Sequence, residues 1–325
     1  MAESVHALGR LVPPQLREQM RGQALVLSRR ALGRRHGRHA SARAGVGLDF
    51  RDHRPYVAGD DPRRLDWRAM ARRDRPILRQ TDAEDELSIT VLFDANGGMA
   101  YGEGTRNKQA HAMALGAGLL WLAQRQGDPI GVALGHDGEV DVALARPSGS
   151  RDRLGVLAHR LSELTPAGTC PWIDLLDALA PRLARRSLVV VFSDLIEVGP
   201  DAERTPQTEA ALWRGLSGLS ARGHEVVVVQ VLHPDEIEFP WTDDRMLRFE
   251  DLRQIHDTLE SPGQRLRDAY LEKFGAHLTA IEAACEHAGL RLLRTRTDEP
   301  AAAAFVRLLG LLAGAAPAET VEAHP

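Results

Sequence analysis

The chain has 325 residues, of which 43% are hydrophobic and 26% charged, as expected for a soluble globular protein of one large or two modest domains. Its two cysteines, Cys170 and Cys285, exclude a disulfide framework and a Cys-rich zinc site. The net charge of −4 hides an asymmetry, because residues 1–79 carry 18 Arg and 8 acidic residues, about +10, and the remainder carries about −14.

The first twenty residues lack a basic start followed by a long apolar run, so no signal peptide is predicted. The longest late apolar stretch, Ala301 to Gly314, contains Arg307 and is too short to span a bilayer. We therefore expect a cytoplasmic protein without a membrane span, ending in a small, polar and flexible tail at 315–325.

An acidic pair before Pro62 predicts an N-cap and a helix that runs to about Arg73. Within this helix, Arg63 comes three residues before Asp66 and four before Trp67, so these side chains can share a face. One interpretation is a partly buried ion pair between Asp66 and a neighbouring Arg, which would fix this segment on the acidic body. The alternative is a surface that binds a partner, made of Asp60, Asp61, Arg63 and Asp66.

From about residue 86 the chain alternates between β-branched apolar runs, typical of strands covered on both faces, and helical periodicity. This alternation predicts an α/β fold, a doubly wound, mainly parallel sheet with helices on both faces. In chain order we expect a strand at 87–94, a helix at 107–125, a hairpin of strands at 129–134 and 139–144, helices at 151–164 and 171–186, a strand at 187–194, a helix at 209–222, a strand at 224–232, a helix at 264–287, a strand at 289–295 and a helix at 299–312.

Polar side chains follow two of the predicted buried strands. Asp94 ends the first strand and is followed by Asn96, whereas Ser193 and Asp194 end the second, and Thr169 lies in a small-residue loop before a helix. In doubly wound sheets ligands bind beyond the carboxyl ends of the strands, where such oxygens can surround a divalent cation. Each residue could equally cap a helix or close a turn, and both interpretations stay open.

The same residues resemble the metal-ion-dependent adhesion site of von Willebrand factor A domains, through Asp94-x-Asn96-x-Gly98-Met99, Gly168-Thr169 and Ser193-Asp194. That family has Asp-x-Ser-x-Ser in the first loop and binds magnesium, with water and an acidic partner residue completing the shell. The resemblance implies Mg²⁺ ligands at Asp94, Asn96, Thr169 and Asp194, and partner contacts at Gly98, Met99 and Ser193. Because both serines are replaced, a metal-free platform is favoured, with a Mg²⁺ site as the alternative.

The segment 38–80 resembles the signature of a bacterial family called domain of unknown function 58. Two later stretches, 233–241 and 248–251, are similar to the insert of its soluble short form, so that the resemblance covers about residues 30–312. The matching signature positions are Gly45-x-Gly47, Asp49-Phe50, Arg54-x-Tyr56, Gly59-Asp60-Asp61, Arg63, Asp66-Trp67, Ala71-Arg72 and Glu84-x-Glu86.

Members of that family are usually encoded beside MoxR-type AAA+ ATPases. The resemblance therefore implies a non-catalytic adaptor or co-chaperone that works with such an ATPase and a client protein, with the loops around Asp94, Thr169 and Asp194, the adhesion site or its metal-free remnant, as the expected docking face. It also implies a basic extension at 1–80 packed on the body, and a von Willebrand factor A-like domain at 81–314 with an insert at about 233–262.

The sequence also bears on two other classes of function, polyanion binding and hydrolysis or phosphotransfer. The Arg-rich run Arg29–Arg43 predicts salt-dependent binding of nucleic acid or another polyanion, unless it is a basic helix laid across the acidic body. A hydrolase is not expected, because the common nucleophile, zinc and phosphate-loop motifs are missing from the sequence. A phosphotransferase with Asp94 as nucleophile would want a carboxylate where Asn96 stands.

Overall fold

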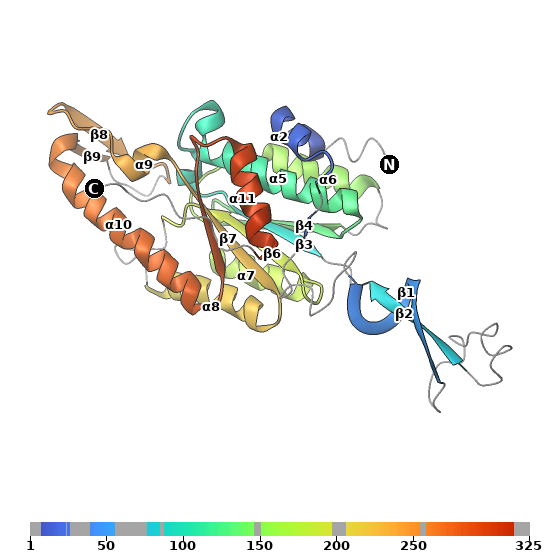
Figure 1. Cartoon of the computed structure of the whole chain (residues 1–325). Helices are drawn as coiled ribbons and strands as arrows, with labels where there is room; N and C mark the ends of the chain where they lie inside the picture. The colour runs from blue at the N-terminus through green and yellow to red at the C-terminus, as the bar shows by residue number, and fades with distance from the viewer. Residues whose placement is uncertain are drawn as a thin grey trace. The chain divides into compact units, whose positions relative to one another are not determined.

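The computed structural model describes residues 8–23, 25–26, 40–55, 77–84, 88–145, 151–196, 206–253 and 258–314 (Figure 1). The chain divides into two compact units, residues 27–87 on the one hand and residues 1–26 with 88–325 on the other. The helix expected up to Arg73 lies outside the described residues, and so do four predicted partner-binding residues, Asp60, Asp61, Arg63 and Asp66.

The smaller unit contains two antiparallel strands, β1 (Ala40–Pro55) and β2 (Ile77–Glu84). Their register runs from Ala40 opposite Glu84 to Pro55 opposite Ile77, with a shift between Gly45 and Phe50, where the longer strand accommodates extra residues. The last residues of the Arg29–Arg43 run begin β1, so the expectation of a helix is wrong for residues 40–43. The rest of that run lies outside the described residues.

A six-stranded sheet forms the centre of the larger unit, in the order β10-β7-β6-β3-β4-β5. All neighbouring strands are parallel except β4 and β5, which form the predicted antiparallel hairpin. The predicted α/β doubly wound fold is thereby confirmed. The strands are β3 (Ile89–Asp94), β4 (Ile130–His136), β5 (Glu139–Ala145), β6 (Leu188–Ser193), β7 (Glu225–Leu232) and β10 (Arg291–Arg296).

Helices cover both faces of this sheet, as the sequence predicts for strands that are apolar on both sides (Figure 1). On one face lie α5 (Lys108–Gln126) and α11 (Ala301–Leu312), and on the other lie α7 (Trp172–Leu179), α8 (Pro206–Ala221) and α10 (Gly263–His287). Helix α6 (Arg151–Glu163) packs against β5, and short 3₁₀ turns lie at η2 (Gly97–Ala100), η3 (Gly104–Arg106) and η4 (Ala180–Arg182).

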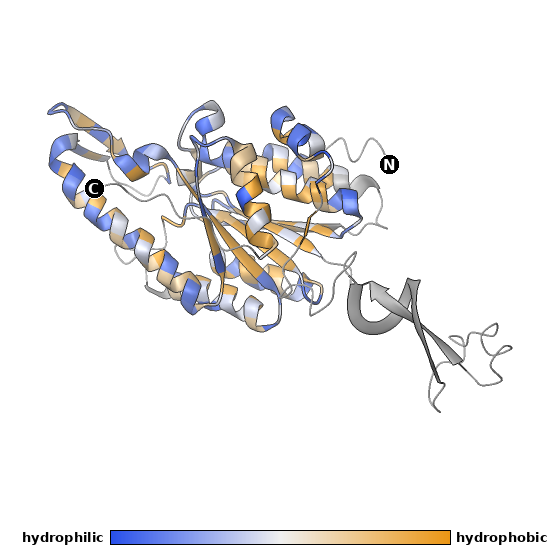
Figure 2. Cartoon of the chain, viewed as in Figure 1, coloured by the Kyte–Doolittle hydropathy of each residue, from blue (hydrophilic) through white to orange (hydrophobic). Residues whose placement is uncertain are grey.

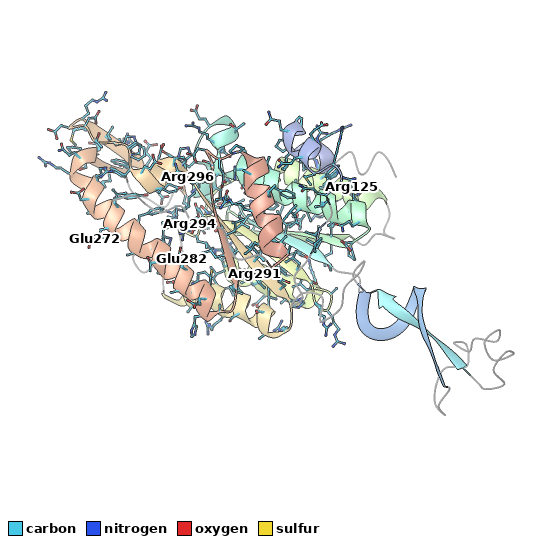
Figure 3. All side chains as sticks on the ribbon, in the orientation of Figure 1. Arg125, Glu272, Glu282, Arg291, Arg294 and Arg296 are labelled. Carbon is cyan, nitrogen blue, oxygen red and sulfur yellow. The ribbon has the colours of Figure 1, made fainter. Side chains whose placement is uncertain are left out.

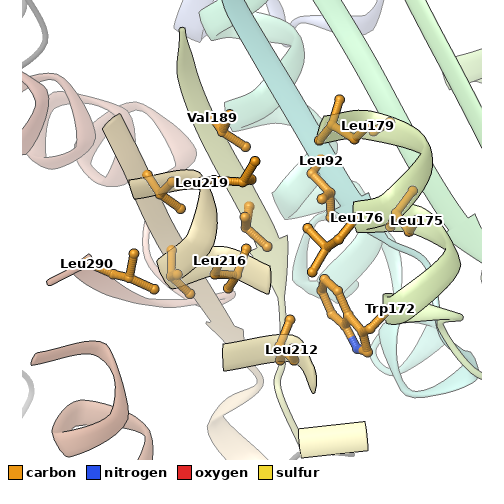
Figure 4. Packing of buried hydrophobic residues seen from close by; sticks show 14 of the residues in the cluster. Leu92, Trp172, Leu175, Leu176, Leu179, Val189, Leu212, Leu216, Leu219 and Leu290 are labelled. Carbon is orange, nitrogen blue, oxygen red and sulfur yellow. The ribbon is translucent and has the colours of Figure 1, made fainter. Parts of the chain in front are cut away.

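Successive strand residues point to opposite faces, which divides the core into two layers. Leu92, Val189 and Val191 face α7, α8 and α10, where they pack with Trp172, Leu176 and Leu216 (Figure 4). On the opposite face α5 approaches the sheet so closely that a Cβ at Gly116 would overlap with the Phe93 ring. Figure 2 shows the apolar residues gathered on the strands and on the helix sides that face them.

The N-terminal residues belong to the larger unit. Helix α2 (Pro14–Gln19) packs on α11, and the main chain of Leu25 forms two hydrogen bonds with the Gln126 side chain at the end of α5. The structure thus separates the first 26 residues from the rest of the predicted 1–80 extension. Buried apolar side chains explain this attachment: Leu8, Val12, Leu16, Met20 and Leu25.

The predicted insert follows β7 and contains α9 (Pro234–Glu238) and a two-stranded antiparallel sheet of β8 (Met246–Glu250) and β9 (Thr258–Pro262). Phe239 anchors it through ring contacts with Trp241, Phe249 and Tyr270 of α10. Both cysteines are buried. Among the described residues, no helix is long and apolar enough to cross a membrane.

Candidate functional site

The two strand-end aspartates lie at the switch in strand order, where β3 pairs with β6. The parallel register places Phe93 beside Phe192, so Asp94 at the end of β3 and Asp194 just after β6 come together at one edge of the sheet. Each is only 1% exposed. The sheet topology therefore brings together the two carboxylates that the sequence predicts to share one site.

Asp94 accepts hydrogen bonds on both of its oxygens. Ser193 Oγ donates to Oδ2 at 2.5 Å, Asn96 Nδ2 donates to the same oxygen at 3.0 Å, and the Asn96 backbone N–H donates to Oδ1 at 3.0 Å. Burial and then the charge of Asp194 raise the pKa of Asp94 to about 7, against which these hydrogen bonds act. Asp94 is thus a carboxyl group enclosed by donors.

Asn96 turns its side-chain NH₂ group, and not its carbonyl oxygen, toward the two aspartates. Its Oδ1 accepts from the Gly98 backbone N–H at 2.7 Å, which fixes the orientation of the amide and caps η2. Its Nδ2 then donates to Asp94 and, at 3.3 Å, to Asp194 Oδ1. Asn96 cannot offer an oxygen to a cation in this arrangement, because an amide nitrogen is only a donor.

A lysine that we did not single out from the sequence completes the site. Lys108, the first residue of α5, is 0% exposed, and its Nζ lies 2.7 Å from Asp194 Oδ2 and 2.7 Å from Glu236 Oε1. Burial alone would lower the pKa of Lys108, but the two carboxylates outweigh it and raise that pKa. Burial would likewise raise the pKa of Asp194, but Lys108 outweighs it and lowers that pKa.

Glu236 comes from α9 of the insert and is held from several sides. Its Oε2 accepts from the His233 backbone N–H at 2.7 Å, which closes a capping box at the start of α9. Tyr270 Oη donates to the Glu236 carbonyl at 2.9 Å, and Tyr101 Oη donates to Asp235 Oδ2 at 3.0 Å. The insert also lies against the first loop, since a Cβ at Gly97 would overlap with the insert backbone.

A chain of hydrogen bonds links Asp194 to the edge strand β10 and from there to α10. Gln230 Nε2 donates to the Asp194 carbonyl at 3.0 Å, and Arg294 Nε donates to Gln230 Oε1 at 2.9 Å. Arg294 also forms an ion pair with Glu282 of α10 at 2.7 Å, and both residues are labelled in Figure 3. The main chain around Asp194 is therefore tied to β7, β10 and α10.

The remaining predicted site residues lie close by but take other roles. Thr169 accepts from the Gly138 N–H through its carbonyl, and no hydrogen bond in the described part of the chain joins its hydroxyl to Asp94 or Asp194. Met99 and Ser193 are fully buried, and Gly98 is half-buried. Partner contacts at these three residues stay a prediction.

The donor set does not fit a magnesium ion of the adhesion-site type. All four carboxylate oxygens of Asp94 and Asp194 accept hydrogen bonds from internal groups. Gly98 supplies no ligand, and a Cβ there would lie 2.8 Å from Asp194 Oδ2. Within the described ranges, no group of three His, Cys, Asp or Glu side chains is arranged to hold a metal.

Residues 52–279 match the family described as "Protein of unknown function DUF58". The chain belongs to this family. The matched region of this DUF58 protein runs from β1 into α10 and includes the strand-end aspartates, Lys108 and the insert with Glu236.

Three mycobacterial relatives resemble this DUF58 protein. The uncharacterized proteins Rv1480 of Mycobacterium tuberculosis and Mb1516 of Mycobacterium bovis are each 27% identical over 312 residues, which covers 94% of this chain and 94% of the relative. The uncharacterized protein MAV169 of Mycobacterium avium is 28% identical over 145 residues, 43% of this chain and 77% of its own length. The two longer matches extend across both compact units.

Proposed function

We propose that this DUF58 protein is a non-catalytic adaptor or co-chaperone that works with a MoxR-type AAA+ ATPase and a client protein. The observation that carries the proposal is the closure of the strand-end site. Asp94, Asp194 and Lys108 are at most 1% exposed and bonded to internal partners, so a substrate has no access to them. The resemblance described above supports the choice of the ATPase.

We place the docking surface on the insert that closes this site. Its two-stranded sheet exposes Met246 (64%) on one face and Leu259 (51%) on the other, because Leu259 pairs with Phe249, three residues along the strand from Met246. Leu252, two residues after β8, is 44% exposed. Large apolar side chains that stay exposed are frequent in protein contact surfaces, and the insert presents one on each face of its sheet. In this scheme the strand-end residues hold the insert in position, and the insert contacts the ATPase.

A pull-down with the purified MoxR-type ATPase of the same genome tests the proposal. The double variant Met246→Asp, Leu259→Asp is expected to lose the ATPase whichever face of the insert sheet it contacts, because a charge desolvated in an apolar contact has no partner. Val306→Asp is the matched control, since this α11 residue is 43% exposed and lies outside the insert. Equal retention of the ATPase by both variants would contradict the docking surface, and no retention by the native protein would contradict the partner.

Nucleic-acid binding through Arg29–Arg43 stays a prediction, because only residues 40–43 of that run are described. A filter-binding assay at two salt concentrations checks it, since phosphate contacts give strongly salt-sensitive retention.

A further inference from the structure

Lysine is a rare residue in this protein, and its position at 108 is unusual. The chain has 41 basic residues, of which only Lys108 and Lys273 are lysines. A cation in the first turn of a helix also opposes the helix dipole, whose positive end lies there. Local rules therefore favour neither lysine nor any cation at this position, so the explanation has to be tertiary.

The groups around the Lys108 ammonium explain why this position holds a lysine and not an arginine. Nζ lies 2.7 Å from one oxygen of Asp194 and 2.7 Å from one oxygen of Glu236, at a side-chain exposure of 0%. An ammonium is a compact point charge that can stand between two carboxylates, whereas a guanidinium is a wide planar fork. The site thus selects a small cation with two acidic neighbours, which is also the general description of a metal position between carboxylates.

The two acidic neighbours come from different parts of the fold. Asp194 belongs to the sheet edge, and Glu236 belongs to α9 of the insert, where its second oxygen is already occupied by the His233 N–H. Lys108 therefore joins the sheet to the insert by one ion pair on each side. Removal of either carboxylate would leave the ammonium with one partner in a site without solvent.

We propose that the Lys108 ammonium is the resident cation of the strand-end site, in the place of a metal ion, and that Glu236 is the built-in acidic ligand that closes the insert over it. The inference goes beyond the proposed function, because it concerns the isolated protein and needs no ATPase. Its failure and the failure of the adaptor role are therefore observed in separate experiments.

Lysine methylation tests the closure, because the chain contains an internal reference. Formaldehyde and borohydride modify accessible amines, and peptide mass spectrometry separates Lys108 from Lys273, which is exposed on α10. In the native protein Lys108 is expected to react at least about tenfold more slowly than Lys273, because modification requires local opening. Glu236→Gln is expected to raise the Lys108 rate severalfold and to leave Lys273 unchanged.

Glu238→Gln is the matched control on the same short helix. Glu238 is exposed and pairs with Arg296, so its loss should leave the Lys108 rate at the native value. Reaction of Lys108 as fast as Lys273 in the native protein would overturn the proposal, and so would a Glu236→Gln variant whose Lys108 reacts at the native rate.

Thermal unfolding in MgCl₂, in MnCl₂ and in EDTA tests the cation itself. We expect one unfolding midpoint under all three conditions, because the carboxylate oxygens are already occupied by internal donors. A midpoint that rises with either metal in the native protein, and does not rise in Asp194→Asn, would overturn the assignment of the site to Lys108.

Discussion

Lys108 Nζ and Asp194 Oδ2 lie 2.7 Å apart with side-chain exposures of 0% and 2%, although 86 residues separate them in the sequence. This ion pair connects the start of α5 to the edge of the sheet where β3 and β6 end. A buried pair is costly to desolvate, but it is costlier to break, because the remaining charge has neither water nor a partner.

Replacement of the buried lysine should be severely destabilising. Lys108→Met keeps an unbranched side chain, one atom shorter, and leaves the buried Asp194 and the partly buried Glu236 without their cation, so the free energy of unfolding should fall by about 3–5 kcal/mol. Urea unfolding followed by circular dichroism measures the change. Lys273→Met, at the exposed lysine of α10, should lower the free energy of unfolding by no more than about 1 kcal/mol, because interactions of exposed charges contribute little.

Gly98→Ser restores the last serine of the Asp-x-Ser-x-Ser motif. We expect this change to destabilise the protein and to create no metal site. In Gly98→Ser the new Cβ would start 2.8 Å from Asp194 Oδ2 and 2.9 Å from Asn96 Oδ1, so the loop must move, at about 1–3 kcal/mol. The same change at Gly155 on α6 meets open space and should be tolerated. Urea unfolding of both variants, with and without MgCl₂, checks this, and a Mg²⁺-stabilised Gly98→Ser protein would contradict it.

His111 should make stability depend on pH. Burial lowers the pKa of His111, with Glu299 and Asp298 acting against this shift and Arg307 with it, and His111 Nε2 contacts Thr295 Oγ1 at 3.0 Å. The unfolded chain binds a proton here more readily than the folded protein, so stability is lost as the pH falls through the ordinary histidine range.

His111→Gln keeps a donor for the threonine but does not titrate. Its free energy of unfolding should therefore fall less steeply than that of the native protein between neutral and mildly acidic pH, as measured by urea unfolding at several pH values. Parallel pH curves for the two proteins would show that His111 makes no contribution.

The N-terminal helix should contribute to the stability of the larger unit. Leu16 of α2 is 1% exposed, and its side chain lies close to Gly118 of α5. Leu16→Ala should lower the free energy of unfolding by about 2–5 kcal/mol through lost burial and a cavity. Val26→Ala is the control, because Val26 is 60% exposed. Equal stability of the two variants would mean that the N-terminal residues do not fold with the sheet.

Much of the fold could be predicted because its signals are local. Runs such as Leu188–Ser193 are short, almost wholly apolar and rich in valine, and Lys108–Gln126 is a long, largely apolar stretch ended by Gly127, so element type and order follow from neighbouring residues. Their alternation then limits the topology to a doubly wound sheet. In the smaller unit β1 and β2 were not predicted, because the charged and glycine-containing pattern of 40–55 gives no clear period.

The charge asymmetry between residues 1–79 and the remainder of the chain does not explain how the N-terminal residues attach. The described residues among the first 26 attach to α5 and α11 through buried apolar side chains such as Leu16 and Met20. The charges that determine the strand-end site are buried ones such as Lys108 and Asp194, and the net charge of a segment does not reveal them.

The sequence by itself determined the α/β fold class, the order of the strands of the central sheet and of the long helices around it, and the family, and it pointed to the strand ends at Asp94 and Asp194. Only the tertiary structure decided what surrounds these carboxylates. Lys108 and Glu236 are 128 residues apart in the chain, and no local pattern signals that they pair. The side chain of Lys108 is 0% exposed and that of Glu236 is 16% exposed, so the loss of either partner would leave a charge with little solvent around it.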